Sequence, residues 1–254
     1  MDAKKNQGFT LVELLVVIGI LGILSAALFP AIGNAVLKAN MTAVGTRGKD
    51  IYVAIVGANT EREPLGLGNV WPKKSTPAEA GAGGGGADQD ISEQRYTTSS
   101  EYFYDLMDGA NFGQARWAPY AQGLDFSKLA GAGVPAKPDS SGTLQAANNM
   151  WTIAADIRDE MEDVIPILVT RNVNEGTTVL KPTVNNPSRA RIDQWWSTAN
   201  ERKAPFSNKG FVMVRKGGAV FTMTSRYVNE FTLYQGQAFD TTAGGGIGIS
   251  YMIP

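Results

Sequence analysis

An uncharged stretch near the N-terminus constrains this chain more than any other feature. From Leu14 through Leu37 the sequence runs for 24 residues without a charge, whereas about 20 predominantly apolar residues suffice to cross a bilayer as a helix. A secretory signal peptide fits poorly, because its apolar region is normally only about 7–15 residues long and holds no acid near its start. The stretch therefore predicts a membrane segment at about residues 9–37.

Glu13 lies immediately before this run, and a plain membrane anchor does not explain it. An acidic side chain costs about 2.5–3.5 kcal/mol at the centre of a membrane helix, and less near the interface. A carboxylate in such a place requires a partner of opposite charge. The sequence thus marks Glu13 as a candidate functional residue.

The sequence GFTLVE at residues 8–13 resembles the cleavage and methylation site of type IV prepilins and type II secretion pseudopilins. In that family a membrane aspartyl protease, the prepilin peptidase, cuts after the glycine and methylates the new terminal amine. The resemblance implies that residues 1–8 are a leader peptide, that Gly8 and Phe9 form the processing site and that Phe9 begins the mature chain. Glu13 then falls at the position where the family keeps its acid.

Gly22 and Pro30 extend the resemblance, since many relatives carry helix-loosening residues at these places. Proline removes a backbone donor and glycine weakens a helix, so local unwinding on assembly is one expectation. A simple bend in a membrane helix explains the two residues equally well. Together with Glu13, they are the assembly residues that the resemblance implies.

The function implied by the resemblance is that of a structural subunit. The amine of Phe9 stays positive after methylation, and in an apolar environment it would pair with Glu13, either of the same helix, four residues away, or of a neighbouring copy. Pairing with a neighbouring copy would set the register between subunits. The expected product is a type IV pilus-like or type II secretion pseudopilus filament, polymerised through the N-terminal helix. The alternative is a monomeric envelope binding protein or enzyme that uses the segment only as a membrane tether.

The same resemblance implies partners and a location. The partners are further copies in a homopolymer, other pilin-like subunits, the prepilin peptidase and the inner-membrane assembly platform. The leader would face the cytoplasm and the head would lie outside it, first at the inner membrane and then in a periplasmic pseudopilus or a surface pilus. Glu13 argues against a subunit at the filament tip, because the capping member of the family usually lacks this acid.

Composition excludes several kinds of chemistry. The chain has no histidine and no cysteine, which removes imidazole bases, thiol nucleophiles, Cys/His zinc sites and disulfides. Sheet pairing or a bound ion must therefore hold the C-terminal region, where many pilins have a disulfide. A net charge of -1 gives no basic field for nucleic acid. We expect neither enzymatic activity nor a cofactor.

Five acids between residues 156 and 163 keep one alternative open. They could coordinate calcium or serve as a carboxylate pair, although a solvated turn or helix end explains them without a ligand. The glycine run at 83–86 lacks the Gly-Lys-Ser/Thr ending of a phosphate-binding loop, so a connector is expected there. The five acids are Asp156, Asp159, Glu160, Glu162 and Asp163.

The predicted fold class is α+β, with a pilin-like long helix packed on a C-terminal antiparallel sheet. Helical spacing continues beyond Pro30 in an apolar stripe, which predicts a helix from Phe9 to about Val56. The helical segment is therefore assigned residues 9–57, and the globular head is assigned residues 58–254. The stripe consists of Leu37, Met41, Val44, Gly48, Ile51 and Ile55.

The head contains local signals for smaller elements. Thr98 and Glu101 form a capping-box pattern that predicts a short helix ended by Gly109, and residues 164–170 are typical of a strand. Two β-rich runs joined at residues 216–218 predict a hairpin. A strand is also expected at 231–239, whereas residues 244–254 are left as either a strand or a loose tail.

Overall fold

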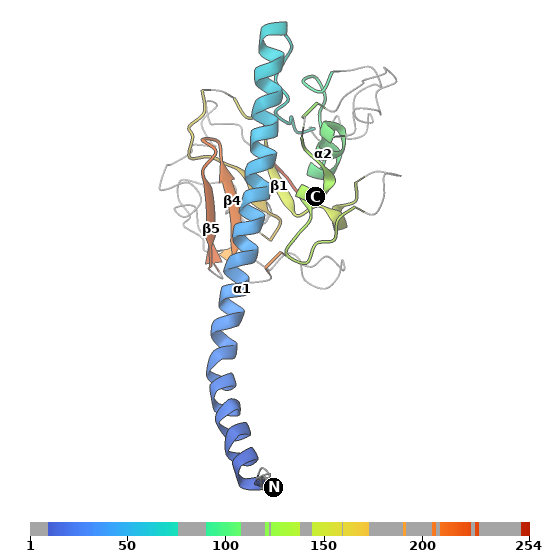
Figure 1. Cartoon of the computed structure of the whole chain (residues 1–254). Coiled ribbons are helices and arrows are strands. Elements are labelled where there is room, and N and C mark those ends of the chain that lie inside the picture. Colours follow the sequence, from blue (N-terminus) through green and yellow to red (C-terminus); the bar gives the residue numbers. More distant parts are fainter. Residues whose placement is uncertain are drawn as a thin grey trace, which may run out of the picture. The chain divides into compact units, whose positions relative to one another are not determined.

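The computed structural model describes residues 10–75, 90–107, 120–121, 123–137, 144–158, 160–172, 190–191, 205–206, 209–224, 227–228 and 250–254. It divides into two compact units, Met1–Asn40 and Met41–Pro254. The boundary falls inside helix α1 (Leu11–Arg62), the first element in Figure 1. The strand expected at 231–239, the glycine run at 83–86 and Gly109 lie outside the described residues.

The second unit is built around a five-stranded antiparallel sheet with the order β5-β4-β2-β1-β7. All residues of β1, β2 and β4 are buried, so both faces of the central sheet are covered. The strands are β1 (Trp151–Ala155), β2 (Pro166–Thr170), β4 (Phe211–Arg215), β5 (Val220–Met223) and β7 (Ser250–Met252), and β3 (Ala190–Arg191) pairs separately with β6 (Tyr227–Val228). Short 3-10 helices occur at Glu63–Leu65, Phe126–Leu129 and Ala146–Asn148.

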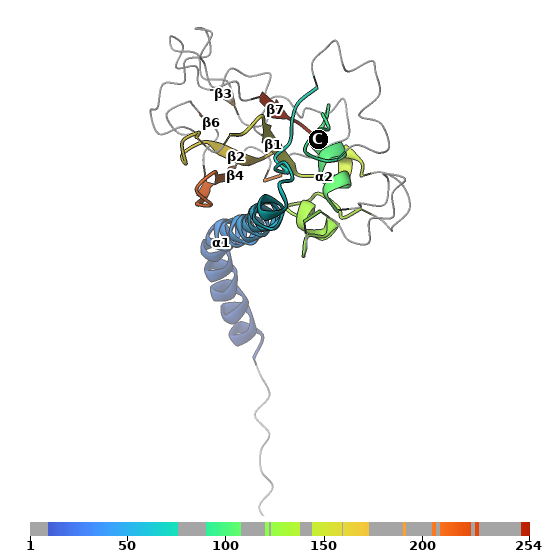
Figure 2. The same ribbon diagram turned by 90° about the horizontal axis from the view of Figure 1, so that it is seen from above.

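The part of α1 that begins at Met41 packs on one face of this sheet, as Figures 1 and 2 show. The predicted stripe is confirmed from Met41 onward, because Met41, Val44, Gly48, Ile51 and Ile55 are all buried. Its first member, Leu37, belongs to the first unit and is only half-buried. Gly45 and Gly48 lie on the buried face of the helix and allow its backbone to approach the sheet closely. A Cβ on Gly45 would lie 2.8 Å from the side chain of Val220 in β5. The α+β arrangement of a long helix and an antiparallel sheet is thus as predicted.

Gly48 gives a direct test of this packing. Its Cβ would lie 2.7 Å from the ring of Trp151 and 2.8 Å from a methyl group of Val214, so Gly48→Ala is expected to lower the free energy of unfolding by about 1–3 kcal/mol. Gly57→Ala is the matched control, because nothing lies within 4 Å of a Cβ there. It should raise stability by up to about 1 kcal/mol through helix propensity. Urea unfolding of the detergent-solubilised chain measures both, and equal stabilities would contradict this packing.

Helix α2 (Ser99–Met107) begins with the predicted capping box. The Glu101 carboxylate accepts the backbone N–H groups of Thr97 at 2.9 Å and Thr98 at 3.1 Å, while the Glu101 N–H donates to Thr98 Oγ1 at 3.2 Å. Three large side chains of α2 are completely buried. They are Tyr102, Phe103 and Leu106. The helix is tied to the sheet by Ser99 Oγ, which donates to the Trp151 carbonyl at 2.7 Å.

The C-terminal region is held by sheet pairing. Strand β7 pairs with β1, and Ser99 N–H donates to the Ile253 carbonyl at 2.9 Å. The Tyr251 hydroxyl is buried and donates to the Pro166 carbonyl at 2.9 Å, across β1. Of the two devices expected in place of a disulfide, sheet pairing is therefore present. Of the two alternatives for the tail, residues 250–252 form the strand.

Two boundaries and one strand differ from the sequence-based expectations. Helix α1 runs to Arg62 rather than ending near Val56, because Gly57 faces open space and Ala58 and Arg62 continue its buried face. Strand β2 starts at Pro166, after a turn, whereas the sequence predicted a start at residue 164. The strand β1 was not predicted. The hairpin at 216–218 is confirmed, with Gly218 in the left-handed conformation at φ 75° that the turn requires.

Candidate functional site

Glu13 lies in the first turn of α1, and its side chain folds back toward the residue that precedes the helix. Its Oε2 accepts hydrogen bonds from the Thr10 backbone N–H at 2.9 Å and the Thr10 hydroxyl at 2.7 Å. The Glu13 backbone N–H donates to Thr10 Oγ1 at 3.3 Å. These reciprocal bonds form a capping box. They place the carboxylate at the positive end of the helix dipole.

Beyond this capping box, the first unit presents apolar side chains that no described residue covers. Among the described residues, one helical stretch, Leu11–Leu65, is long and apolar enough to cross a membrane, by length and composition alone. Apart from the half-buried Leu37, the described large apolar side chains here are exposed. They are Leu11, Val12, Leu14, Leu15, Val16, Val17, Ile18, Ile20, Leu21, Ile23, Leu24, Leu28, Phe29, Ile32 and Val36. An apolar surface of this extent indicates contact with lipid or with other proteins.

The other residues proposed from the sequence are spread along the same helix. Gly22 has open space around its α-carbon, and Pro30 lies inside α1, which continues through it. At 1.5 Å per residue, Glu13 and Pro30 are about 25 Å apart along the axis, so the structure does not gather them into one site. Gly8 and Phe9 lie outside the described residues.

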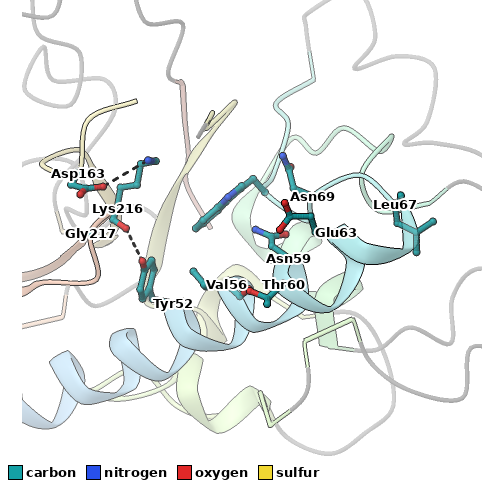
Figure 3. A pocket seen from close by; sticks show the side chains of 12 residues that line it. Tyr52, Val56, Asn59, Thr60, Glu63, Leu67, Asn69, Asp163, Lys216 and Gly217 are labelled. Atoms are coloured by element: carbon teal, nitrogen blue, oxygen red, sulfur yellow. Dashed lines mark hydrogen bonds and ion pairs between the residues drawn. The ribbon is translucent and has the colours of Figure 1, made fainter. Parts of the chain in front are cut away.

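The second unit contains a hollow of about 760 Å³ between the end of α1, the loop that follows it and the β4–β5 turn (Figure 3). Two polar side chains that line it form hydrogen bonds with backbone carbonyl groups of the second unit. The Tyr52 hydroxyl donates to the Lys216 carbonyl at 2.8 Å, and Lys216 Nζ donates to the Met161 carbonyl at 2.8 Å. Burial, with a smaller effect of the nearby Asp163 carboxylate, raises the pKa of Tyr52 and keeps its hydroxyl a neutral donor. The bond from Tyr52 attaches the β4–β5 turn to α1, and the bond from Lys216 attaches it to the turn between β1 and β2.

The described acids between residues 156 and 163 lie in the turn that joins β1 to β2. The Asp156 carboxylate accepts the Ser250 hydroxyl at 3.0 Å, whereas Asp163 lies 3.8 Å from Lys216 Nζ. Asp159 is outside the described residues. Within the described ranges, no three acidic side chains lie close enough together to hold a metal ion.

Comparison with protein families identifies the N-terminal site. Residues 3–29 match the model described as the prokaryotic N-terminal methylation motif. The chain carries this motif. The methylation motif includes Gly8, Phe9, Glu13 and Gly22, and it ends one residue before Pro30. It is the signal motif of type IV pilins and pseudopilins and therefore indicates a pilin-like precursor.

The methylation motif covers a small N-terminal part of the chain, so it carries no information about the head. Neither a curated protein nor a solved structure matches the chain. The apolar helix that begins within the motif is consistent with membrane anchoring.

Thr10 is the residue of this site that the sequence analysis did not single out. The signal was available, because Thr10 and Glu13 have the same Thr-x-x-Glu spacing that predicted the start of α2. Within the structure the pair forms three hydrogen bonds, and these fix where the carboxylate lies.

Proposed function

We propose that this chain is a structural subunit of a filament, either a type IV pilus-like fibre or a type II secretion pseudopilus. One observation carries the proposal: the methylation motif extends into a long helix whose N-terminal apolar side chains, from Leu11 to Val36, have no cover within the described residues. A prepilin peptidase would cut between Gly8 and Phe9 and methylate the new amine. Polymerisation would then bundle the N-terminal helices and cover their apolar surface.

Electrostatics supports a specific role for Glu13 in this assembly. A terminal amine on Phe9 and a carboxylate on Glu13 are each costly in an apolar environment, and their attraction is stronger there than in water. In a staggered bundle, the amine of an incoming copy meets the carboxylate of the copy already docked. Pairing offsets both costs at one axial position only, so it fixes the register of the homopolymer.

The tether alternative accounts for the apolar helix but leaves the methylation motif without a purpose. We therefore assign the chain no enzymatic activity and no cofactor, in keeping with a sequence that lacks histidine and cysteine. Its partners are other pilin-like subunits, the peptidase, the inner-membrane assembly platform and the membrane itself. Nucleic acid is not among them, since the net charge is only -1.

The location of the filament separates its two forms. Without a disulfide to strengthen a long extracellular fibre, we favour the pseudopilus, with the head in the periplasm. The test is an antibody against the head, applied to intact cells and to cells with an opened envelope. Signal only after opening, together with lost secretion in a deletion strain, is expected. Long labelled fibres on intact cells would contradict the pseudopilus and support the surface pilus, and a uniformly monomeric membrane protein would contradict both.

A further inference from the structure

The capping box at the start of α1 leaves half of the Glu13 carboxylate available. Both hydrogen bonds from Thr10 end on Oε2, so Oε1 has no partner among the described residues. The Glu13 side chain is exposed and has three rotatable bonds, which would otherwise let the carboxylate sample many positions. Thr10 therefore restricts the carboxylate to one place, and among the described residues none occupies its second oxygen.

The contact between Thr10 and Glu13 does not depend on any residue that cleavage after Gly8 would remove. If the peptidase cuts after Gly8, Phe9 carries the terminal amine, and Thr10 is the first residue whose backbone N–H is an amide. All three hydrogen bonds between Thr10 and Glu13 therefore survive cleavage. The carboxylate stays folded back toward the N-terminal end of the helix, at the level where terminal amines gather in a bundle of staggered helices.

We propose that Thr10 is the positioning residue for Glu13, and that its hydroxyl presents Glu13 Oε1 to the terminal amine of a neighbouring subunit. This inference rests on the proposed function, in which that amine and Glu13 pair during assembly. A side chain fixed by a supporting hydrogen bond in its bound geometry loses less conformational freedom when its partner arrives. Thr10 would thus act on assembly through Glu13, without contacting the incoming subunit.

A merely structural role for Thr10 is the competing explanation, because an N-cap threonine also helps a helix to begin. Three substitutions separate the two roles. Thr10→Ser keeps the hydroxyl, Thr10→Val removes it at nearly the same volume, and Thr10→Gly removes it while remaining an acceptable N-cap that costs only a few tenths of a kcal/mol. Only the positioning role predicts that the glycine variant fails.

The experiment expresses each full-length variant in cells that lack other copies and measures membrane insertion, cleavage and sheared filaments per cleaved chain. We expect Thr10→Ser to form filaments within about twofold of the parent. Thr10→Val and Thr10→Gly should each give at least about tenfold fewer filaments than the parent. This factor corresponds to the loss of one hydrogen bond to a charged group. Their cleavage should be unchanged.

Parental filament yields from Thr10→Gly would overturn the inference and leave Thr10 as an N-cap only. Loss of cleavage in both the valine and glycine variants would also overturn it, because the positioning role begins after cleavage. A Glu13→Val chain tested in parallel distinguishes a failure of the role of Glu13 from a failure of the role of Thr10. If it too assembles, the proposed role of Glu13 itself fails; if it does not assemble while Thr10→Val does, only the role of Thr10 fails.

Discussion

Glu13→Val is expected to abolish filament formation while the chain still inserts into the membrane and is still cleaved. The substitution removes a charge that costs up to about 2.5–3.5 kcal/mol inside a bilayer, so insertion should be unchanged or improved. Assembly should fail because the terminal amine of each incoming subunit would then have no partner in the apolar bundle. Sheared filaments from a strain that lacks other copies measure the effect.

Glu13→Gln separates the charge from the capping box. Glutamine can still accept the Thr10 backbone N–H and start the helix, but it carries no charge, so this variant should fail as well. Glu61→Gln is the matched control, since Glu61 is an exposed acid in the last turn of the same helix. It should assemble like the parent. Glu13→Val subunits that enter filaments as readily as the parent would show that Glu13 does not set the register.

Gly8→Leu is expected to block maturation almost completely. The peptidase site that the methylation motif implies must accept a residue with almost no side chain before the cut, so leucine should leave the precursor uncut in the membrane. Mass spectrometry of the parent should find a chain that begins at Phe9 with one added methyl group. The Gly8→Leu chain should begin at its original N-terminus.

Ala3→Leu controls for a general effect of leader substitutions, because it lies five residues before Gly8. It should be processed like the parent. The parent chain recovered uncut and unmethylated from cells with an active prepilin peptidase would refute the assignment of the processing site.

The sequence predicted those parts of the fold that depend on neighbours along the chain. The stripe on α1, the capping box of α2 and the β4–β5 hairpin all follow from local spacing, and all are present. The end of α1 does not follow from local spacing. Arg62 is buried there by an ion pair with Asp90 and by a hydrogen bond to the Gly68 carbonyl at 2.7 Å, and an isolated arginine gives no sign of such partners.

Strand β1 was missed for a related reason. Its sequence WTIAA does not alternate between apolar and polar residues, because every position is buried in the middle of the sheet. Strand β7 could not be chosen over a loose tail without knowing that β1 would be its partner. Both elements are defined by contacts distant in sequence.

The motif of the candidate site was predicted from the sequence, but its geometry was not. The spacing from Gly8 to Glu13 was enough to identify the motif. How the carboxylate is held depends on a side-chain rotamer, and the sequence pattern does not specify it. The same Thr-x-x-Glu rule that located α2 would have found the bond between Thr10 and Glu13, had it been applied at the edge of the apolar run.

The pairing of β7 with β1 affects the order in which the head can mature. About a hundred residues separate these neighbouring strands, so loop closure makes this pairing slow compared with the local hairpin of β4 and β5. Until residues 250–252 have been synthesised and have paired, the edge of β1 that they cover is open to pairing with other chains. A stalled or proteolytically shortened chain would therefore be prone to aggregate at this edge. A chain that is complete to β7 has this edge of β1 covered.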